Sequence, residues 1–356
     1  MRAGSHQIAD MCAPRSRCAS ADRWLVAIAV PAVGAVDWSV FEGLVRTPPD
    51  LAVRVPLEAG MDVVTGAFGY TGRFITRRLL DAGHEVRTLT GHPGRRDPFD
   101  GKVDVARYAF DDPNALVASL RGSDVLYNTY WVRFPRRGTS FDRAVANTRV
   151  LIRAAEEAGV RRLAHISITN PSRVSPLGYF RGKEVVVGSA LSHAIIRPTV
   201  LFGGDDVLIN NIAWLTRKLP FFAVAGTGEY RVRPVFVDDV ARIAVDAGGR
   251  ADDLVIDAVG PETFTFDELV GVVATAVGRQ VRILHVPPAC VVGLAKVLGL
   301  VVRDVMLTSD ELRGLMAGLV STEGPATGGT RLSDWLREHA ADVGRVYASE
   351  LARHYR

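Results

Sequence analysis

The sequence has few cysteines. Cys12, Cys18 and Cys290 are the only three among 356 residues, and they are widely separated. So few and so scattered thiols exclude a disulfide framework and a structural zinc site. The sequence therefore predicts a cytoplasmic protein from a reducing compartment, with no metal site.

A long apolar run is also lacking. The longest uncharged apolar run, Trp24 to Val36, covers 13 residues and contains Pro31, so it is too short to span a bilayer. Asp22, two residues before the run, argues against a signal peptide. Residues 291–302 are apolar but are interrupted by Lys296, and we expect them to form a packed helix rather than a membrane contact. Membrane association is not expected.

Charge of one sign does not accumulate. The chain has 43 basic and 39 acidic residues, without a basic cluster, which argues against nucleic-acid binding. Lysine is scarce: only Lys102, Lys183, Lys218 and Lys296 occur, so nearly all positive charge is arginine. A motif that contains lysine is therefore less easily explained by chance.

The first 60 residues have no sustained helix or strand period, and short apolar pieces alternate with Pro, Gly and Arg. We expect a disordered N-terminal extension, or an upstream start with Met61 as the functional one.

From Met61 onward, expected strands and helices alternate. This order predicts an α/β protein: a Rossmann-type, doubly wound parallel sheet over residues 61–240. A smaller α+β C-terminal lobe with a helical cover is expected over residues 241–356. Strands are expected at 61–65, 85–90, 103–110, 125–130, 162–168 and 194–200, and helices at 70–81, around 145–155 and around Tyr179.

Three glycines, Gly66, Gly69 and Gly72, follow the first expected strand directly and precede a helix. Glycine lets the backbone approach a pyrophosphate, and a helix N-terminus offers it unpaired N–H groups. Because strand, loop and helix occur in this order, the spacing predicts dinucleotide binding rather than a merely tight turn.

The end of the second expected strand lacks the acid that usually holds the ribose of NAD. Thr90 stands there, followed by His92, Arg95 and Arg96, which suit a 2'-phosphate. NADP(H) is therefore preferred, and NAD(H) stays possible. The alternative is that the two arginines belong to a solvated loop.

Tyr179 and Lys183 are four positions apart, which places them on one face of a helix. A tyrosine titrates near 10 and needs a nearby cation to act as an acid or base at neutral pH. Lys183 would supply that charge and also bind the nicotinamide ribose. The pair predicts proton transfer coupled to hydride transfer.

A hydroxyl partner is expected on the strand upstream, where His165, Ser167 and Thr169 alternate and project to one side. Either Ser167 or Thr169 would orient a substrate oxygen, and the sequence leaves the choice open. For His165 we prefer a core position to a catalytic one.

Together these elements resemble the short-chain dehydrogenase/reductase superfamily, in its atypical and extended branch of NAD(P)-dependent epimerases/dehydratases and NmrA-like proteins. The resemblance covers roughly residues 61–240. It is carried by TGAFGYTG (65–72), YFRGK (179–183), RPTVLFG (197–203) and PVFVDDVA (234–241).

The resemblance implies roles for individual residues. The sequence departs from it at Ala109, where relatives often carry an acid, and in having Ser167-Ile168-Thr169 instead of a serine pair. The resemblance implies that Gly66, Phe68, Gly69 and Tyr70 lie at the pyrophosphate, and that Phe110 and Asp111 lie near adenine. It also implies that Thr129 lies near the nicotinamide ribose, that Pro198 lies beside the nicotinamide, and that Tyr179 and Lys183 are the active pair.

Two classes of function fit these features. The first is an NADP-dependent oxidoreductase or epimerase that acts on a hydroxyl or carbonyl of a small molecule, as a monomer or homodimer. The second is a binding protein, either a redox sensor like the NmrA regulator or an assembly subunit like an accessory subunit of respiratory complex I. Expected substrate contacts are Tyr130, Trp131, Arg133, Asn210, Asn211, Arg231 and Arg233, although surface salt bridges are the simpler expectation for Arg231 and Arg233.

Overall fold

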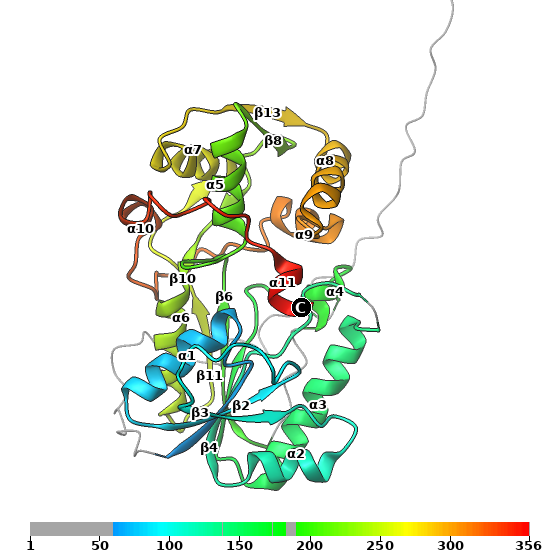
Figure 1. Cartoon of the computed structure of the whole chain (residues 1–356), viewed down its shortest axis with the longest axis vertical. Helices are drawn as coiled ribbons and strands as arrows, with labels where there is room; N and C mark the ends of the chain where they lie inside the picture. The colour runs from blue at the N-terminus through cyan, green and yellow to red at the C-terminus, as the bar shows by residue number, and fades with distance from the viewer. Residues whose placement is uncertain (1–59, 137, 173, 183–189, 356) are drawn as a thin grey trace, which may run out of the picture. The chain divides into compact units, whose positions relative to one another are not determined.

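The structure is a computed structural model, and it describes residues 60–136, 138–172, 174–182 and 190–355. The expected N-terminal extension and Lys183 lie outside the described residues. Figure 1 shows a parallel sheet with its helices in one part of the described chain and a second, smaller group of elements in another.

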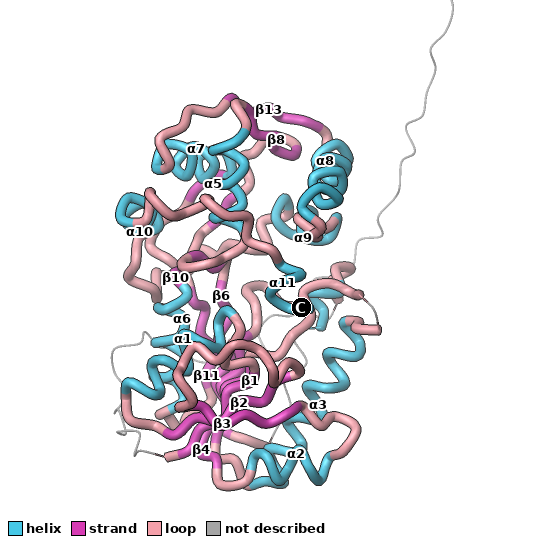
Figure 2. Tube along the Cα trace, in the orientation of Figure 1, coloured by secondary structure: helices cyan, strands magenta, loops and turns pink. Residues whose placement is uncertain are grey.

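The central element is a seven-stranded sheet in the order β11-β6-β5-β4-β1-β2-β3, with every neighbouring pair parallel. Strands buried on both faces are typical of such sheets, and four of the five residues of β1 are buried. Figure 2 shows these strands in magenta, with helices on either side. The strands are β1 (Met61–Thr65), β2 (Glu85–Thr90), β3 (Val103–Arg107), β4 (Ser123–Asn128), β5 (Arg162–Ile166), β6 (Ser192–Pro198) and β11 (Leu254–Ala258).

Helices cover both faces of the sheet. Val63 and Val64 are consecutive in β1 and enter different hydrophobic clusters, because side chains of a strand alternate between its faces. One cluster contains buried residues of α1 and α6, and the other contains buried residues of α2 and α3. The helices are α1 (Tyr70–Asp81), α6 (Val237–Gly248), α2 (Pro113–Leu120) and α3 (Phe141–Ala158), with the short α4 (Gly178–Gly182) after β5.

A third hydrophobic cluster forms the core of the smaller lobe, which contains Phe202, Phe266, Trp335 and their neighbours. Three two-stranded sheets, β7-β10, β8-β13 and β9-β12, join its helices. The lobe contains β7 (Leu201–Phe202), α5 (Leu208–Lys218), β8 (Phe221–Ala225), β9 (Arg231–Val232), β10 (Val235–Phe236), β12 (Phe264–Thr265), α7 (Phe266–Ala276), β13 (Arg282–Val286), α8 (Pro288–Val302), α9 (Ser309–Met316) and α10 (Leu332–Glu338), and α11 (Glu350–Tyr355) follows.

The sheet confirms the predicted Rossmann-type fold, but the two lobes exchange segments along the chain. α6 spans the boundary predicted at residue 240 and β11 lies beyond it, yet α6 packs on the sheet and β11 pairs with β6. Conversely, residues 201–236 contribute β7 to β10 and α5 to the smaller lobe. The chain crosses to the smaller lobe after β6 and returns for one more helix and strand.

Several strands end earlier than predicted. β3 ends at Arg107 rather than 110, and β4, β5 and β6 each end two residues before the predicted position. Their β-rich sequences continue into loops at the carboxyl edge of the sheet, where Thr129, Ser167 and Val200 line a cavity. Ligands bind at this edge in open parallel sheets.

The helix expected at residues 291–302 exists as α8, but the expectation that it is packed is wrong. Gly299 is its only buried residue, whereas Val297, Leu300 and Val301 are 59%, 80% and 76% exposed. Within the described part of the chain, no helix combines the length and apolar character that a membrane span requires.

Candidate functional site

The glycine loop after β1 adopts the backbone that its sequence predicts. Gly66 has φ +67°, in the left-handed region that favours glycine, and its carbonyl accepts from the Gly69 N–H at 2.8 Å. A Cβ on Gly72 would come within 2.2 Å of that same carbonyl oxygen. A side chain at position 72 would therefore push the first turn of α1 off the loop.

A threonine at the end of β1 fixes the loop to the neighbouring strand. The Thr65 hydroxyl accepts from the backbone N–H groups of Thr129 and Tyr130, at 2.7 and 3.0 Å, and donates to the Asn128 side chain at 3.1 Å. These bonds hold the ends of β1 and β4 together. Thr129 is thereby placed beside Gly66.

One cavity of about 990 Å³ brings most of the predicted site residues together, within the size range of ligand pockets. Asp111 is exposed and Thr169 is buried, and both lie outside its lining. Lys183 lies outside the described residues. The predicted residues that line the cavity are Gly66, Phe68, Gly69, Tyr70, Gly72, Thr90, Arg95, Phe110, Thr129, Ser167, Tyr179 and Pro198.

The end of β2 shapes the part of the cavity where a ribose phosphate is expected. The Thr90 hydroxyl accepts from the His92 N–H at 3.0 Å, and both residues line the cavity. Arg95 lines it too, whereas Arg96 is exposed and outside the lining. Burial lowers the pKa of Arg95, and the nearby Arg353 guanidinium lowers it further. A phosphate beside Arg95 would relieve that repulsion.

An aromatic cluster forms the adjoining wall and includes Tyr108, which sequence reasoning missed. Tyr108 stacks on Phe110 with ring centroids 4.8 Å apart and meets Tyr130 edge-on at 5.2 Å. The Tyr130 hydroxyl accepts from the Asn147 side chain at 2.8 Å. Flat apolar surfaces of this kind suit a purine ring.

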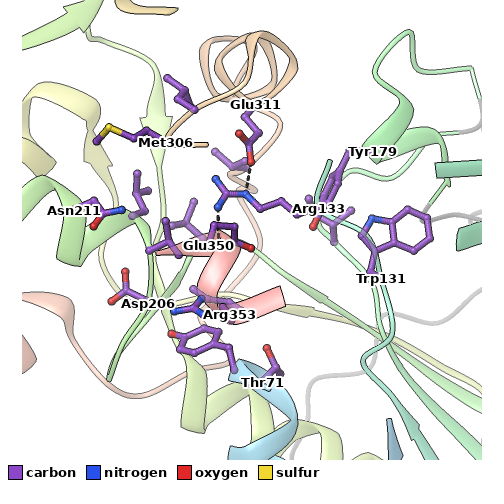
Figure 3. Close-up of a pocket in the computed structure, with 18 of the residues that line it drawn as sticks. Thr71, Trp131, Arg133, Tyr179, Asp206, Asn211, Met306, Glu311, Glu350 and Arg353 are labelled. Atoms are coloured by element: carbon purple, nitrogen blue, oxygen red, sulfur yellow. Dashed lines mark hydrogen bonds and ion pairs between the residues drawn. The ribbon is translucent and has the colours of Figure 1, made fainter. Parts of the chain in front are cut away.

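Tyr179 follows the loop after β5 and lies in the short helix α4. Its ring meets Trp131 and Phe141 edge-on, with centroids 6.2 Å from each. Figure 3 shows Tyr179 on one side of the cavity, beside Trp131 and Arg133.

Burial raises the pKa of Tyr179 to about 12. The Arg133 guanidinium lowers this pKa, and the carboxylates of Glu311 and Glu350 raise it. Tyr179 is therefore protonated at neutral pH.

The structure distinguishes the two candidate hydroxyls by position. Ser167 is 4% exposed and lines the cavity, and its N–H donates to the Ile196 carbonyl at 2.7 Å. Thr169 is 1% exposed and lies outside the lining. His165 is buried in β5, with its ring nitrogen 3.0 Å from the Asn128 side-chain nitrogen, which agrees with the preferred core position.

Arg133 connects the loop after β4 to two C-terminal helices. Its guanidinium pairs with Glu311 of α9 and with Glu350 of α11, the latter at 2.8 Å. Burial disfavours the charged guanidinium, but the two carboxylates outweigh burial and raise the pKa of Arg133. Figure 3 shows the three side chains meeting in the cavity wall. Among the described residues, the ion-paired Arg133 is the cation that lowers the pKa of Tyr179.

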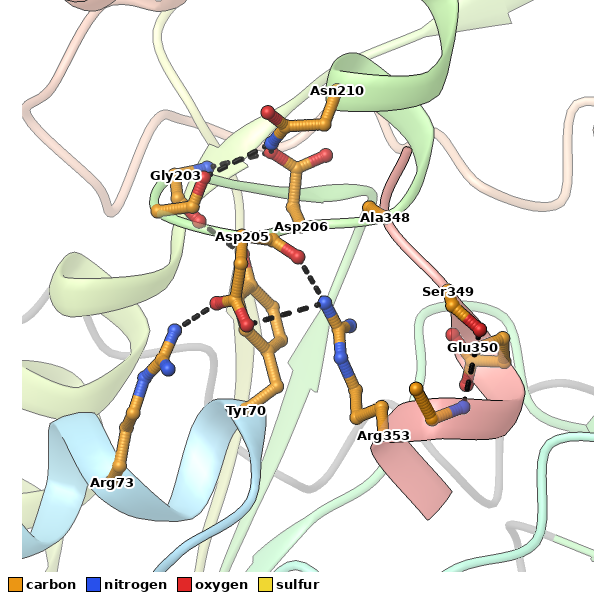
Figure 4. A network of polar contacts seen from close by, with 12 residues as sticks. Tyr70, Arg73, Gly203, Asp205, Asp206, Asn210, Ala348, Ser349, Glu350 and Arg353 are labelled. Atoms are coloured by element: carbon orange, nitrogen blue, oxygen red, sulfur yellow. Dashed lines mark hydrogen bonds and ion pairs between the residues drawn. The ribbon is translucent and has the colours of Figure 1, made fainter. Parts of the chain in front are cut away.

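A second polar network lies beside the glycine loop (Figure 4). The Tyr70 hydroxyl donates to the Gly203 carbonyl at 2.9 Å, and the Arg353 guanidinium lies over the Tyr70 ring, 4.7 Å from its centroid. Asp205 pairs with Arg73 of α1 and with Arg353 of α11. The backbone carbonyl of Arg353 also accepts from Arg95. α11 thus borders the cofactor end of the cavity.

Asp206 is the most perturbed acid in this network. It is 1% exposed, and its carboxylate accepts from the N–H groups of Ile209 and Gly203, at 2.7 and 3.3 Å, and from the Asn210 side chain at 3.0 Å. Burial raises its pKa to about 7, although these bonds and Arg353 lower it.

Of the expected substrate contacts in the smaller lobe, only some line the cavity. Asn211 lines the cavity, and its side chain exchanges two hydrogen bonds with the backbone of Ala348, at 2.8 and 3.1 Å. The Asn210 side chain donates a hydrogen bond to the carboxylate of Asp206 instead. Arg231 is exposed, and Arg233 differs from the expected surface salt bridge because it donates to three backbone carbonyls.

Sequence reasoning missed Asp206, between β7 and α5, and three residues that the C-terminal segment brings to the cavity: Glu311, Glu350 and Arg353. For Glu311 a local signal exists, since Thr308 and Glu311 have the spacing of a capping box and form one. That signal predicts the start of a helix, and nothing in it points to Arg133.

Residues 66–211 match the model of a protein family described as NAD(P)H-binding. The chain carries an NAD(P)H-binding domain. The matched residues include the glycine loop, Arg95, Ser167 and Tyr179. The match supports the NAD(P)H-binding part of the predicted resemblance.

Two relatives of this chain have different functions by name: one is a subunit of NADH dehydrogenase and the other is a reductase. It is 26% identical over 249 residues to NADH dehydrogenase (ubiquinone) 1 alpha subcomplex subunit 9, a mitochondrial protein of Arabidopsis thaliana, covering 63% of this chain and 60% of that subunit. It is 28% identical over 297 residues to the (4-alkanoyl-5-oxo-2,5-dihydrofuran-3-yl)methyl phosphate reductase of Streptomyces griseus, covering 79% of this chain and 98% of the reductase. The chain thus spans less than two thirds of the Arabidopsis subunit.

Among solved structures, the NADPH-dependent quinone oxidoreductase of Escherichia coli in complex with NADPH is similar in fold. The TM-score is 0.63 at 19% identity, and the match covers 78% of this chain and 99% of that one. The two proteins share the Rossmann-type architecture.

Proposed function

We propose that this protein is an NADP(H)-dependent reductase that acts on the carbonyl group of a small molecule. The observation that carries the proposal is a single cavity lined by the glycine loop, Arg95, Ser167 and Tyr179. A bound nicotinamide would supply a hydride to the carbonyl carbon. The protein's own residues would bind the cofactor, orient the substrate oxygen and deliver a proton to it.

The described residues fit such a cofactor. The loop glycines Gly66, Gly69 and Gly72 line the cavity, and the first N–H groups of α1 follow directly. Thr90 and Arg95 favour a 2'-phosphate, and hence NADP(H) over NAD(H), because the loop between β2 and β3 contributes no carboxylate to the lining.

Tyr179 is the proposed proton donor. Because its pKa is about 12, it holds its proton at neutral pH, which suits an acid in carbonyl reduction better than a base in alcohol oxidation. Ser167 lines the same cavity and is the proposed residue that orients the substrate oxygen. Lys183 keeps its proposed role at the ribose as an inference from the YFRGK motif. The Streptomyces griseus relative, named as a reductase, supports the same direction of reaction.

The alternative is a non-catalytic NAD(P)H-binding protein, such as a sensor or an assembly subunit. The Arabidopsis relative, named as a subunit of NADH dehydrogenase, supports it. The aromatic packing of Tyr179 and the two carboxylates near it also disfavour a phenolate. The two functions share the cofactor loop and differ in what Tyr179 does.

Steady-state oxidation of NADPH with a panel of aldehydes and ketones distinguishes the reductase from the non-catalytic binding protein. We expect Tyr179→Phe to lower kcat by roughly 10²- to 10⁴-fold, the usual contribution of a positioned acid, with little change in NADPH affinity. Tyr230→Phe is the matched control, since it removes another tyrosine hydroxyl from the cavity lining. Equal rates for wild type and Tyr179→Phe would rule out the proposed donor, and no turnover by wild type despite NADPH binding would favour the sensor.

A further inference from the structure

The cavity has two ends of different character. Its charged lining residues lie beside the glycine loop or belong to the ion-paired group of Arg133, Glu311 and Glu350. The lining residues contributed by α5, β8 and α8 include no charged side chain, and they are apolar except for Asn211. Ile212, Leu215, Phe222, Leu294 and Leu298 represent this apolar end.

α8 forms one wall of the apolar end. Val291, Leu294, Ala295 and Leu298 recur at helical spacing and line the cavity, while Leu300, 80% exposed, is outside the lining. Leu294 both lines the cavity and is 41% exposed, so the cavity reaches solvent along this helix. Figure 1 shows α8 beside α9 and apart from the parallel sheet.

An apolar wall is costly to keep in contact with water unless a ligand covers it. A compact polar substrate would cover only the end near Tyr179 and Ser167. A substrate with a polar head and a hydrocarbon tail would match both ends, and its tail would desolvate the side chains of α5, β8 and α8.

We propose that the apolar end binds the hydrocarbon chain of the substrate, whose carbonyl group lies beside Tyr179 and Ser167. This inference rests on the proposed reductase function and adds the substrate class: long-chain alkyl aldehydes or ketones. In the reaction the carbonyl carbon gains a hydride from NADPH and the oxygen gains the Tyr179 proton, giving an alcohol and NADP⁺.

The test uses the full-length protein and a series of 2-alkanones of increasing chain length. Burying one methylene contributes about 0.8 kcal/mol, so kcat/KM should rise up to about fourfold per added carbon until the apolar end is full. The matching 2-alkanols, titrated calorimetrically in the presence of NADPH, report chain binding without hydride transfer. Their affinity should rise with length in the same way.

Two variants of α8 provide the matched comparison. Ala295→Trp fills the cavity from its wall, and Val297→Trp places the same side chain two residues further on, at a position that is 59% exposed and outside the lining. Because Gly299 is the only buried residue of α8, neither change disturbs the core. We expect Ala295→Trp to abolish the gain with chain length and to keep NADPH affinity, and Val297→Trp to behave like wild type.

A flat dependence on chain length in wild type, or the wild-type dependence in Ala295→Trp, would overturn the inference. Failure of the proposed function looks different. In that case NADPH would not be oxidised with any alkanone, while the alkanol titrations would still report whether chain length governs binding.

Discussion

At the scale of single residues, Arg95 and Arg96 show how neighbours in sequence differ in position. Both follow β2, but Arg95 lines the cavity and Arg96 is exposed outside it. A charge-assisted hydrogen bond contributes about 1.5–3 kcal/mol. We therefore expect Arg95→Ala to raise the Kd for NADPH roughly 10- to 100-fold, and to leave the Kd for NADH within about twofold.

Arg96→Ala is the control, because it removes the same charge from the adjacent position. Calorimetric titration of both variants with NADPH and NADH measures the effect. An equal loss of affinity for both cofactors in Arg95→Ala, or the same NADPH loss in Arg96→Ala, would contradict the assignment of the 2'-phosphate to Arg95.

At the scale of elements, Asp206 joins the turn after β7 to the first turn of α5. Its pKa is about 7 in the folded protein, against an ordinary value of 3.8, because burial disfavours the carboxylate. Between these two values the folded state holds a proton that the unfolded state has lost. The free energy of unfolding should therefore fall as the pH rises from about 4 to about 7.

We expect Asp206→Asn to flatten this fall, because asparagine does not ionise. Since one pKa unit corresponds to about 1.4 kcal/mol, wild type should lose roughly 2–4 kcal/mol more than the variant between pH 4 and pH 8. Urea unfolding at a series of pH values measures the free energy of unfolding of both proteins. A wild-type slope in Asp206→Asn would refute the assignment.

The elements that the sequence predicts well are those specified locally. β1, the glycine loop and α1 follow each other within about twenty residues, and the structure reproduces their predicted bounds. The carboxyl ends of β4, β5 and β6 were less predictable, because β-forming residues there leave the sheet to line the cavity. α8 was predicted as a helix from its composition, but composition does not tell whether an apolar helix faces a core or a cavity.

At the scale of the whole described molecule, the cavity depends on contacts between distant parts of the chain. Arg95 meets Arg353 across 258 positions, and Arg133 meets Glu311 across 178. No local pattern marks such pairs, and four of the six Asp, Glu and Arg residues in the lining were not predicted from sequence. The exchange of segments between the lobes has the same origin, since the pairing of β11 with β6 is a property of the assembled sheet.

The central claim is that this cavity carries out hydride transfer from NADPH, and deuterium transfer tests it most directly. The full-length protein is incubated with NADPH deuterated at C4 of the nicotinamide and with the alkanone that supports the fastest NADPH oxidation, and the product is analysed by mass spectrometry. The account predicts one deuterium on the new carbinol carbon for each NADPH oxidised. NADPH that binds but never passes deuterium to a carbonyl substrate would contradict it.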